Sequence, residues 1–125
     1  MRRAVLVVDD NSTIRQAICR LFTADEDFDV CGQAKNGREA IAKAQELRPD
    51  LIVIDLSMPI MNGLEATRAI KKIMPTVRII MFTEYDDDFL KQEAHSAGVS
   101  AVLSKSEHIS RLVGTARGLF LAGAA

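Results

Sequence analysis

Five charged or hydroxyl side chains of this sequence stand directly after short apolar runs. They are Asp9, Asp10, Asp55, Thr83 and Lys105, and the runs before them cover residues 4–8, 51–54, 77–82 and 101–104. If these runs are strands of one parallel sheet, their carboxyl ends point the same way, and open α/β sheets bind ligands outside those ends. The spacing therefore predicts one site with three carboxylates, a hydroxyl and an ammonium group.

An acidic cluster of this kind calls for a cation. Neighbouring carboxylates repel one another, which raises their pKa values and destabilises the fold unless a positive ion is present. Mg²⁺ suits the set better than Ca²⁺, because Mg²⁺ needs few protein carboxylates, keeps several waters and shares its octahedron with a phosphate. The carboxylates thus favour a Mg²⁺ site for phosphate chemistry.

One of these carboxylates can itself be the nucleophile and form an acyl phosphate. Asp55 is the best candidate, since it stands alone after the middle run, whereas Asp9 and Asp10 are adjacent and suit a metal. Lys105 would then contribute a positive charge, and Thr83 a hydroxyl donor, to the phosphoryl oxygens. Such chemistry asks the protein mainly to position groups and neutralise charge.

Apolar runs and helical patterns alternate along the chain. The runs cover residues 4–8, 28–31, 51–54, 77–82 and 101–104, and the first and third are almost continuously apolar, as in strands buried on both faces. Apolar residues at helical spacing follow each run, for example from Ile14 to Phe22. This alternation predicts a single α/β domain, a doubly wound (βα)5 fold of right-handed strand-helix-strand units.

Several residues mark where the predicted helices begin and end. Asn36 is placed as an N-cap, and Pro49 stops the helix that follows it. The next helix starts near Gly63. The acidic run of residues 86–88 is typical of an N-terminal cap for the fourth helix, and Gly98 suits its C-terminal end.

The composition leaves room for one domain and argues against several classes of protein. The chain has 125 residues and a net charge of −1, so neither a nucleic acid nor an anionic membrane is an expected partner. The first apolar run is too short for a signal sequence or a membrane span, which predicts a cytoplasmic protein. Cys19 and Cys31 lack the spacing of a zinc site and are expected to be reduced.

The combined motifs resemble the receiver domain of two-component response regulators. They are Val7-Val8-Asp9-Asp10, Asp55-Leu-Ser-Met-Pro59 followed by Met61-Asn-Gly-Leu-Glu65, then Thr83 and Lys105, and the resemblance covers the whole chain. The stretch of residues 48–67 resembles in particular receivers of the LuxR/NarL branch. Full-length members of that branch usually carry a C-terminal helix-turn-helix domain, whereas we expect residues 1–125 to be the receiver domain alone.

The resemblance implies a flavodoxin-like sheet of strand order 2-1-3-4-5 and a phosphorylation switch. Asp55 would accept a phosphoryl group from a sensor histidine kinase, and the domain would catalyse only its own phosphorylation and dephosphorylation. Mg²⁺ would be held by Asp10, Asp55 and the main-chain carbonyl of Ser57, and by Asp9 through a water molecule. Phosphorylation would change the interaction surface, with a homodimer as one expected outcome and transcription regulation as the output.

Three positions depart from the family pattern. Val102 stands where many receivers carry a switch aromatic; Tyr85, two residues after Thr83, either takes part instead or only gates solvent. Glu84 is bulky and negative where a small residue is common, so a side chain pointing into the site would slow the entry of small anionic phosphodonors and of attacking water. Ser106 replaces the proline that often follows the lysine, which predicts a trans peptide bond.

Two alternatives belong to other functional classes. A receiver that works as an interaction module without phosphorylation is consistent with Glu84 and Val102, although all the expected site positions are filled. A Mg²⁺-dependent small phosphohydrolase would need a further acid-base carboxylate beside Asp55 and a lid for its substrate. Leu56 and Ser57, which follow Asp55, do not supply that carboxylate.

Overall fold

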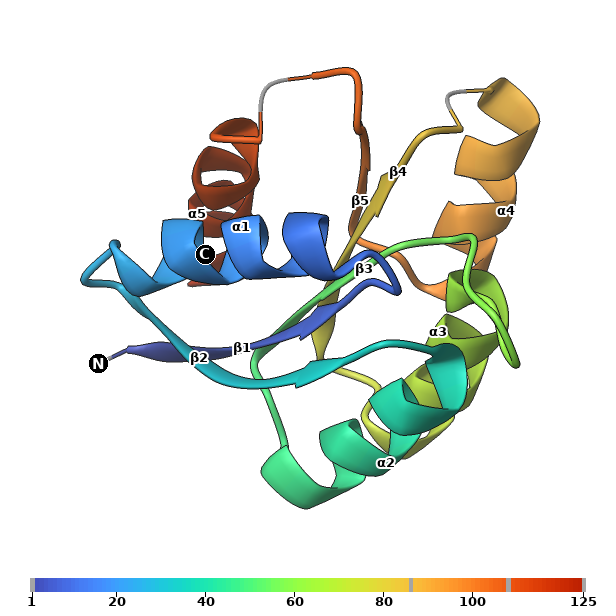
Figure 1. Cartoon of the computed structure of the whole chain (residues 1–125), viewed down its shortest axis with the longest axis horizontal. Helices are drawn as coiled ribbons and strands as arrows, with labels where there is room; N and C mark the ends of the chain where they lie inside the picture. Colours follow the sequence, from blue (N-terminus) through green and yellow to red (C-terminus); the bar gives the residue numbers. More distant parts are fainter. Residues whose placement is uncertain (1, 86, 108, 125) are drawn as a thin grey trace.

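Strands and helices alternate as the sequence patterns predict. The computed structural model describes residues 2–85, 87–107 and 109–124, and within them five strands alternate with five helices (Figure 1). The strands are β1 (Arg3–Val8), β2 (Phe28–Ala34), β3 (Leu51–Ile54), β4 (Arg78–Thr83) and β5 (Ala101–Ser104). The helices are α1 (Ser12–Thr23), α2 (Gly37–Leu47), α3 (Gly63–Ile73), α4 (Asp88–Ala97) and α5 (Arg111–Ala124).

The strands form a parallel sheet in the order β2-β1-β3-β4-β5, which confirms the predicted doubly wound fold. Val8 at the end of β1 pairs with Ile54 at the end of β3. On the other side, Thr83 at the end of β4 pairs with Ser104 at the end of β5. The carboxyl ends of these four strands therefore meet at one edge of the sheet.

β2 is longer than the apolar pattern predicts. It extends to Ala34, beyond the predicted end at Cys31. The register shifts between Val5 and Leu6 of β1, where Cys31 of β2 is passed over, and Val8 then lies opposite Ala34. Main-chain hydrogen bonds carry this pairing, and a polar residue such as Gln33 makes them as readily as an apolar one. An apolar pattern alone therefore misses the end of this edge strand.

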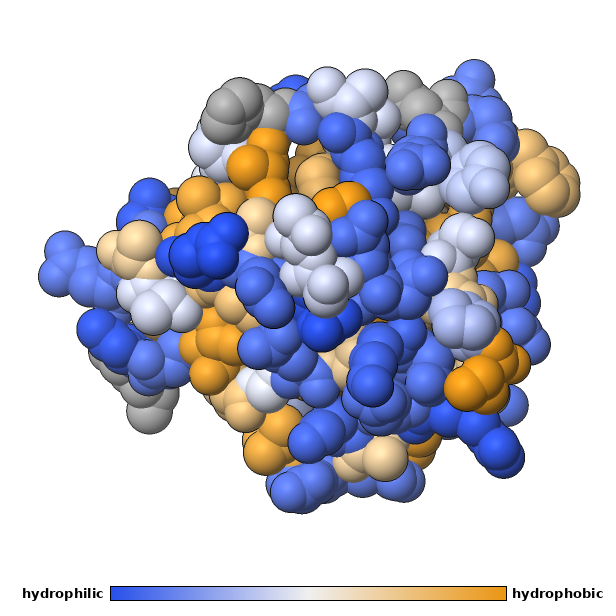
Figure 2. Space-filling view, viewed as in Figure 1, coloured by the Kyte–Doolittle hydropathy of each residue, from blue (hydrophilic) through white to orange (hydrophobic). Residues whose placement is uncertain are grey.

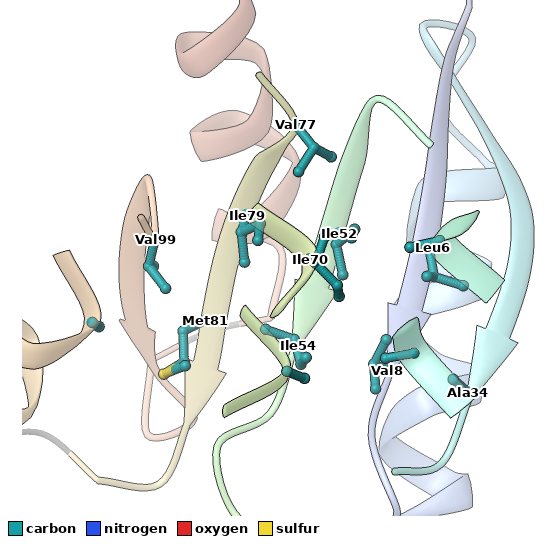
Figure 3. Packing of buried hydrophobic residues seen from close by; sticks show 14 residues of the cluster. Leu6, Val8, Ala34, Ile52, Ile54, Ile70, Val77, Ile79, Met81 and Val99 are labelled. Carbon is teal, nitrogen blue, oxygen red and sulfur yellow. The ribbon is translucent and has the colours of Figure 1, made fainter. Parts of the chain in front are cut away.

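Alternate side chains of each strand point to opposite faces of the sheet. Leu51 and Val53 of β3 belong to a core cluster with residues of α1 and α5, whereas Ile52 and Ile54 belong to a second cluster with residues of α2, α3 and α4. Figure 3 shows side chains of β1, β3 and β4 gathered near Ile70 of α3 in the second cluster. In Figure 1, α1 and α5 lie on the opposite side of the sheet from α2 and α3. Burial on both faces explains why β3 is apolar at every position.

Caps fix the helix ends close to where the sequence places them. The side chains of Asn36 and Asp87 accept main-chain N–H groups at the starts of α2 and α4. Gly98 ends α4 with a φ of 107°, in the left-handed region that favours glycine. These residues confirm the predicted ends, while Asp86 of the acidic run lies outside the described residues.

The start of α3 packs directly against the chain that leaves β3. Asn62 and Glu65 form a reciprocal capping box, and the Gly63 N–H donates to the Leu56 carbonyl at 2.8 Å. A Cβ atom on Gly63 would lie 2.1 Å from the main-chain oxygen of Asp55. Only glycine therefore lets α3 approach Asp55 this closely.

Figure 2 shows a mainly hydrophilic face on which apolar residues form small separate patches. Large exposed apolar side chains include Ile60, Ile73, Tyr85, Phe89 and Leu121. Among the described residues, no helix has the length and apolar character needed to cross a membrane.

Gly63→Ala is expected to destabilise the domain by roughly 1–3 kcal/mol, because the added methyl group forces α3 away from the Asp55 main chain. Gly114→Ala in α5 is the matched control, since beyond its own helix backbone and chain neighbours no described atom lies within 4 Å of a Cβ there. That change is expected to stabilise by about 0.5–1 kcal/mol through helix propensity. Urea unfolding measures both effects, and a Gly63→Ala variant as stable as wild type would contradict the close contact.

Candidate functional site

The sheet fixes Asp9 and Asp55 at the ends of neighbouring strands. The Asp9 N–H donates to the Ala34 carbonyl of β2 at 3.1 Å, and the Asp55 N–H donates to the Val8 carbonyl of β1 at 3.0 Å. The hydrogen bonds between neighbouring strands therefore continue one residue past the ends of β1 and β3. Asp9 and Asp55 are buried, whereas Asp10 is exposed. One carboxylate oxygen from each of the three aspartates lies within 4.8 Å of the others. The structure thus brings together the carboxylates that the strand-end spacing predicted to converge.

Neither Asp9 nor Asp10 caps the first helix. The cap is Asn11, whose side-chain oxygen accepts the Ile14 N–H at 3.1 Å. Asp9 uses its Oδ1 to accept the Asn11 N–H at 2.9 Å, which fixes the turn from β1 into α1. Asp9 Oδ2 and the whole Asp10 carboxylate therefore remain for other partners.

Lys105 joins two of the aspartates. Its Nζ lies 2.9 Å from Asp9 Oδ2 and 3.2 Å from Asp55 Oδ2, and its side chain is only 11% exposed. The Lys105 N–H donates to the Thr83 carbonyl at 2.7 Å, which anchors its backbone where β4 and β5 end. A single ammonium group thus offsets part of the negative charge of three carboxylates.

Burial dominates the electrostatics of this cluster. Burial and the charge of Asp9 raise the pKa of Asp55 from 3.8 to about 6, although the Lys105 ammonium lowers it. Burial alone would lower the pKa of Lys105, but the hydrogen bonds and charges of Asp9 and Asp55 together raise it above the ordinary value of 10.5. Lys105 is therefore charged at neutral pH, while the surroundings of Asp55 disfavour its ionised form. An additional cation close to the carboxylate would offset that penalty.

A cavity of about 200 Å³ opens at this edge of the sheet. Its walls include Asp10, Asp55, Ser57, Thr83 and Lys105, with Asn11, Ile14, Glu84 and Tyr85 completing them. Of the three aspartates, Asp9 is the one outside this lining, held by Lys105 and the Asn11 N–H instead. Because a liquid water molecule occupies about 30 Å³, the space admits a hydrated ion or a small phosphate.

Thr83 and Tyr85 are linked at the end of β4. Thr83 is fully buried, and its Oγ1 accepts the Tyr85 N–H at 3.3 Å. Accepting this bond uses a lone pair, so the hydroxyl hydrogen is still able to donate. The half-exposed Tyr85 side chain lines the acidic cavity and also an adjacent apolar hollow that Leu56 and Phe89 help to form. Tyr85 is therefore a wall shared by two neighbouring spaces.

The three positions that depart from the family pattern lie in different surroundings. Glu84 is exposed and lines the cavity, so its charge lies at the entrance. Val102 is half-buried and packs against the cluster under α2, α3 and α4, away from the cavity wall. The peptide bond between Lys105 and Ser106 is trans, as predicted, because cis bonds do not occur in the described chain.

Two further contacts of the site were missed by the sequence patterns. Arg15 Nη1 donates to the Asp9 carbonyl at 2.9 Å, and its Nε donates to Gln33 of β2 at 3.0 Å. The hydroxyl oxygens of Ser104 and Ser106 lie 2.7 Å apart, one on either side of Lys105 in the sequence. The sequence around Arg15 gives no sign of these contacts, because Asp9 and Gln33 approach Arg15 only in the folded structure. Serines two residues apart are a local turn signal that could have been recognised.

The donor set suits a hard divalent cation. Three carboxylates offer oxygen ligands within 4.8 Å of one another, beside a cavity with room for water. Mg²⁺ prefers such oxygens, is held by few carboxylates and retains several waters. Burial, and then the charge of Asp9, raise the pKa of Asp55 despite the nearby Lys105 ammonium, so a further cation beside this carboxylate would favour its ionised form. The residues present therefore fit a Mg²⁺ ion.

Comparison with known proteins adds independent information. Residues 5–117 match the family model of the response regulator receiver domain. The response regulator protein VraR of Staphylococcus saprophyticus is 41% identical over 106 residues, covering 85% of this chain and 51% of VraR. The transcriptional regulatory protein LnrK of Bacillus subtilis is 36% identical over 109 residues, covering 87% of this chain and 50% of LnrK. The chain thus spans about half the length of these relatives.

Solved structures of response regulators are also similar to this chain. A two-component response regulator of the LuxR family from Aurantimonas sp. SI85-9A1 superposes with a TM-score of 0.90 and 32% identity, covering 98% of this chain and 87% of that one. The response regulator domain of Thermotoga maritima CheB superposes with a TM-score of 0.81 and 36% identity, covering 87% of this chain and 82% of that one.

Asp55→Asn is expected to raise the free energy of unfolding at neutral pH without divalent cations. The pKa of Asp55 is raised from 3.8 to about 6 in the folded state, so its ionised form destabilises the fold above that pH. This loss of unfolding free energy becomes smaller as the pH falls through the pKa of Asp55 in the folded state, and it is absent below the pKa of Asp55 in the unfolded state. We expect a gain of about 1–2 kcal/mol near neutrality, because the shift of roughly two pKa units already includes the attraction of Lys105 and solvent in the cavity screens part of it.

Urea unfolding of wild type and Asp55→Asn across this pH range, with a chelator present, measures the difference. Asp29→Asn is the matched control, because Asp29 is exposed and pairs with Arg2 far from the cluster. A stabilisation by Asp55→Asn that stays constant from neutral pH down to about pH 4 would contradict the raised pKa.

Proposed function

Because the chain belongs to the response regulator receiver domain family, and to its LuxR/NarL branch, we propose that it is a phosphorylation switch with Asp55 as phosphoacceptor. The observation that carries the proposal is the position of the Asp55 carboxylate. It lines a cavity shared with Thr83 and Asp10, and Lys105 Nζ lies 3.2 Å from its Oδ2. The same cavity is therefore lined by the proposed nucleophile Asp55, the hydroxyl of Thr83, the ammonium of Lys105 and the carboxylate of Asp10.

Receiver domains bind Mg²⁺ at an acidic pocket, and this chain has the residues for it. We assign direct coordination to Asp10, Asp55 and the main-chain carbonyl of Ser57, because all three residues line the cavity. Asp9 would act through a water molecule, since it is buried and already engaged by Lys105. When bound, Mg²⁺ supplies positive charge and oxygen coordination for the phosphoryl group.

The phosphoryl transfer that we propose needs little more than positioning. The ionised Asp55 oxygen attacks the phosphorus of a phosphohistidine, the new oxygen–phosphorus bond forms an acyl phosphate, and the phosphorus–nitrogen bond breaks. The imidazole of the donor histidine keeps the electron pair of that bond. The Lys105 ammonium and the Thr83 hydroxyl then bind phosphoryl oxygens, whose negative charge they stabilise. Water attack on the acyl phosphate restores the Asp55 carboxylate and releases inorganic phosphate.

Response regulators are generally signalling proteins rather than enzymes. We therefore propose that this chain turns over only its own phosphoryl group, within the cytoplasm, and that residues 1–125 act as one receiver domain. Its partner would be a sensor histidine kinase. Phosphorylation would change the surface that binds a second copy of the domain or a C-terminal helix-turn-helix domain. The helix-turn-helix domain, and not the receiver domain, would contact the nucleic acid and regulate transcription.

Titration with beryllofluoride and Mg²⁺, followed by backbone NMR, tests the proposal. We expect saturable, Mg²⁺-dependent shifts around Asp55, Thr83 and Lys105, because beryllofluoride bound to a carboxylate stands in for the phosphoryl group. The shifts should vanish in Asp55→Asn and persist in Asp29→Asn, a matched change at an exposed site. A folded wild type without any response would instead favour an interaction module that works without phosphorylation.

Glu84→Ala is expected to accelerate labelling of Asp55 by a small anionic donor such as acetyl phosphate by about threefold to tenfold, because a negative charge at the cavity entrance repels anions. Glu46→Ala removes the same charge from an exposed position on α2 and serves as the control. The initial labelling rates of both variants give the measurement. The gain should fade as salt screens the charge. Equal rates for Glu84→Ala and Glu46→Ala at low salt would show that Glu84 does not guard the entrance.

A further inference from the structure

A tight turn carries Lys105 out of β5. The Ser104 carbonyl accepts the Glu107 N–H at 3.0 Å, which closes a four-residue turn with Lys105 and Ser106 at its centre. On the strand side, the Lys105 N–H donates to the Thr83 carbonyl at 2.7 Å. The Lys105 backbone is thus held from both directions, by the sheet before it and by the turn after it.

The hydroxyl of Ser104 adds a second closure to this turn. Ser104 is buried, with 5% of the residue exposed, and its Oγ accepts the Ser106 N–H at 3.2 Å. The same oxygen lies 2.7 Å from the Ser106 hydroxyl oxygen. A serine that bonds to the main chain two residues on builds a local turn from its own side chain. The residue after Lys105 keeps an N–H group, unlike a proline, and Ser104 satisfies it.

The turn and the sheet fix the direction in which the Lys105 side chain leaves the backbone. A lysine side chain has many rotamers, so its end is located only if its backbone direction and its partners are both fixed. Lys105 Nζ contacts Asp9 at 2.9 Å and Asp55 at 3.2 Å, and the side chain is 11% exposed. If the turn opened, the stem would swing and these short contacts would lengthen together.

We infer that Ser104, assisted by Ser106, is a positioning residue that aims the Lys105 ammonium at Asp55. Ser104 supplies the acceptor for the turn, and the Ser106 hydroxyl orients that acceptor through the contact at 2.7 Å. Ser104 would position Lys105 in this way whether or not Asp55 accepts a phosphoryl group. The consequence for phosphoryl binding rests on the proposed function of Asp55, since Lys105 would hold the phosphoryl oxygens.

Three alanine variants and two readouts test the inference in the full chain. The first readout is the ¹⁵N NMR signal of the Lys105 ammonium, which reports the buried ion pair without any ligand. The second is the apparent affinity for beryllofluoride in saturating Mg²⁺. Ser104→Ala should broaden or shift the ammonium signal and weaken the affinity about fivefold, as expected for one lost hydrogen bond. Ser106→Ala, which keeps the main-chain bond to Ser104, should weaken it about twofold.

Ser100→Ala is the matched control. The Ser100 Oγ accepts the Ile79 N–H at 3.3 Å just before β5 begins, so the variant loses a comparable bond at the opposite end of the strand. We expect both readouts to stay at wild-type values in this variant. If Ser100→Ala changed the ammonium signal and the beryllofluoride affinity as much as Ser104→Ala does, the loss of any serine hydrogen bond near β5 would have the same effect. That result would overturn the inference.

A double-mutant cycle with Lys105→Met separates positioning from a general structural effect. If Ser104 acts through Lys105, Ser104→Ala causes no further loss of beryllofluoride affinity once the ammonium is gone. A further fivefold loss in the Lys105→Met background would overturn the inference, as would an unchanged ammonium signal in a folded Ser104→Ala protein. Should Ser104→Ala fail to fold, the exposed Ser106→Ala variant decides, and wild-type values in both readouts would count against the inference.

The two proposals fail in different ways. Wild-type protein that shows the buried Lys105 ammonium signal but binds no beryllofluoride would refute the phosphoacceptor role of Asp55. The comparison of ammonium signals between wild type and Ser104→Ala would still decide whether Ser104 positions Lys105.

Discussion

The repulsion among three carboxylates held within 4.8 Å of one another is the constraint on which the rest of this structure depends. Water would screen such charges, but two of the aspartates are buried at the end of the sheet. Their backbones cannot move apart, because Asp9 and Asp55 are hydrogen-bonded to neighbouring strands. The fold must therefore supply positive charge, and Lys105 supplies it by joining those two carboxylates.

That constraint explains why the loops around the cluster are so tightly held. Gly63 lets α3 pack against the Asp55 main chain, Arg15 binds the Asp9 carbonyl, and Ser104 closes the turn that carries Lys105. Of these residues only Arg15 is charged, and it binds the main-chain carbonyl of Asp9 rather than a carboxylate oxygen. Each contact fixes the main chain beside a charged side chain, and the burial of the cluster, together with the charge of Asp9, shows in the raised pKa of Asp55.

Much of this arrangement could be predicted from the sequence, because it follows from strand ends. Apolar runs identified the sheet, and the residue types after them identified the five groups that converge, since parallel strands share one edge. The full length of β2 could not be predicted, because its pairing with β1 continues past an irregularity at Cys31 and through polar residues by main-chain hydrogen bonds. The contact of Arg15 with Asp9 was equally hidden, because the partners meet only after β1 and α1 have packed.

The same electrostatic argument bears on how a signal leaves the site. A bound cation or a phosphoryl group would change the charge balance at Asp55, and the buried Thr83 lines the cavity on the β4 side. Thr83 Oγ1 accepts the Tyr85 N–H, and Tyr85 lines both the acidic cavity and an apolar hollow. Val102 packs among aliphatic side chains and offers no ring to turn. The Thr83 carbonyl also accepts the Lys105 N–H at 2.7 Å, so the hydrogen bonds of Thr83 join the site both to the exposed Tyr85 and to the end of β5.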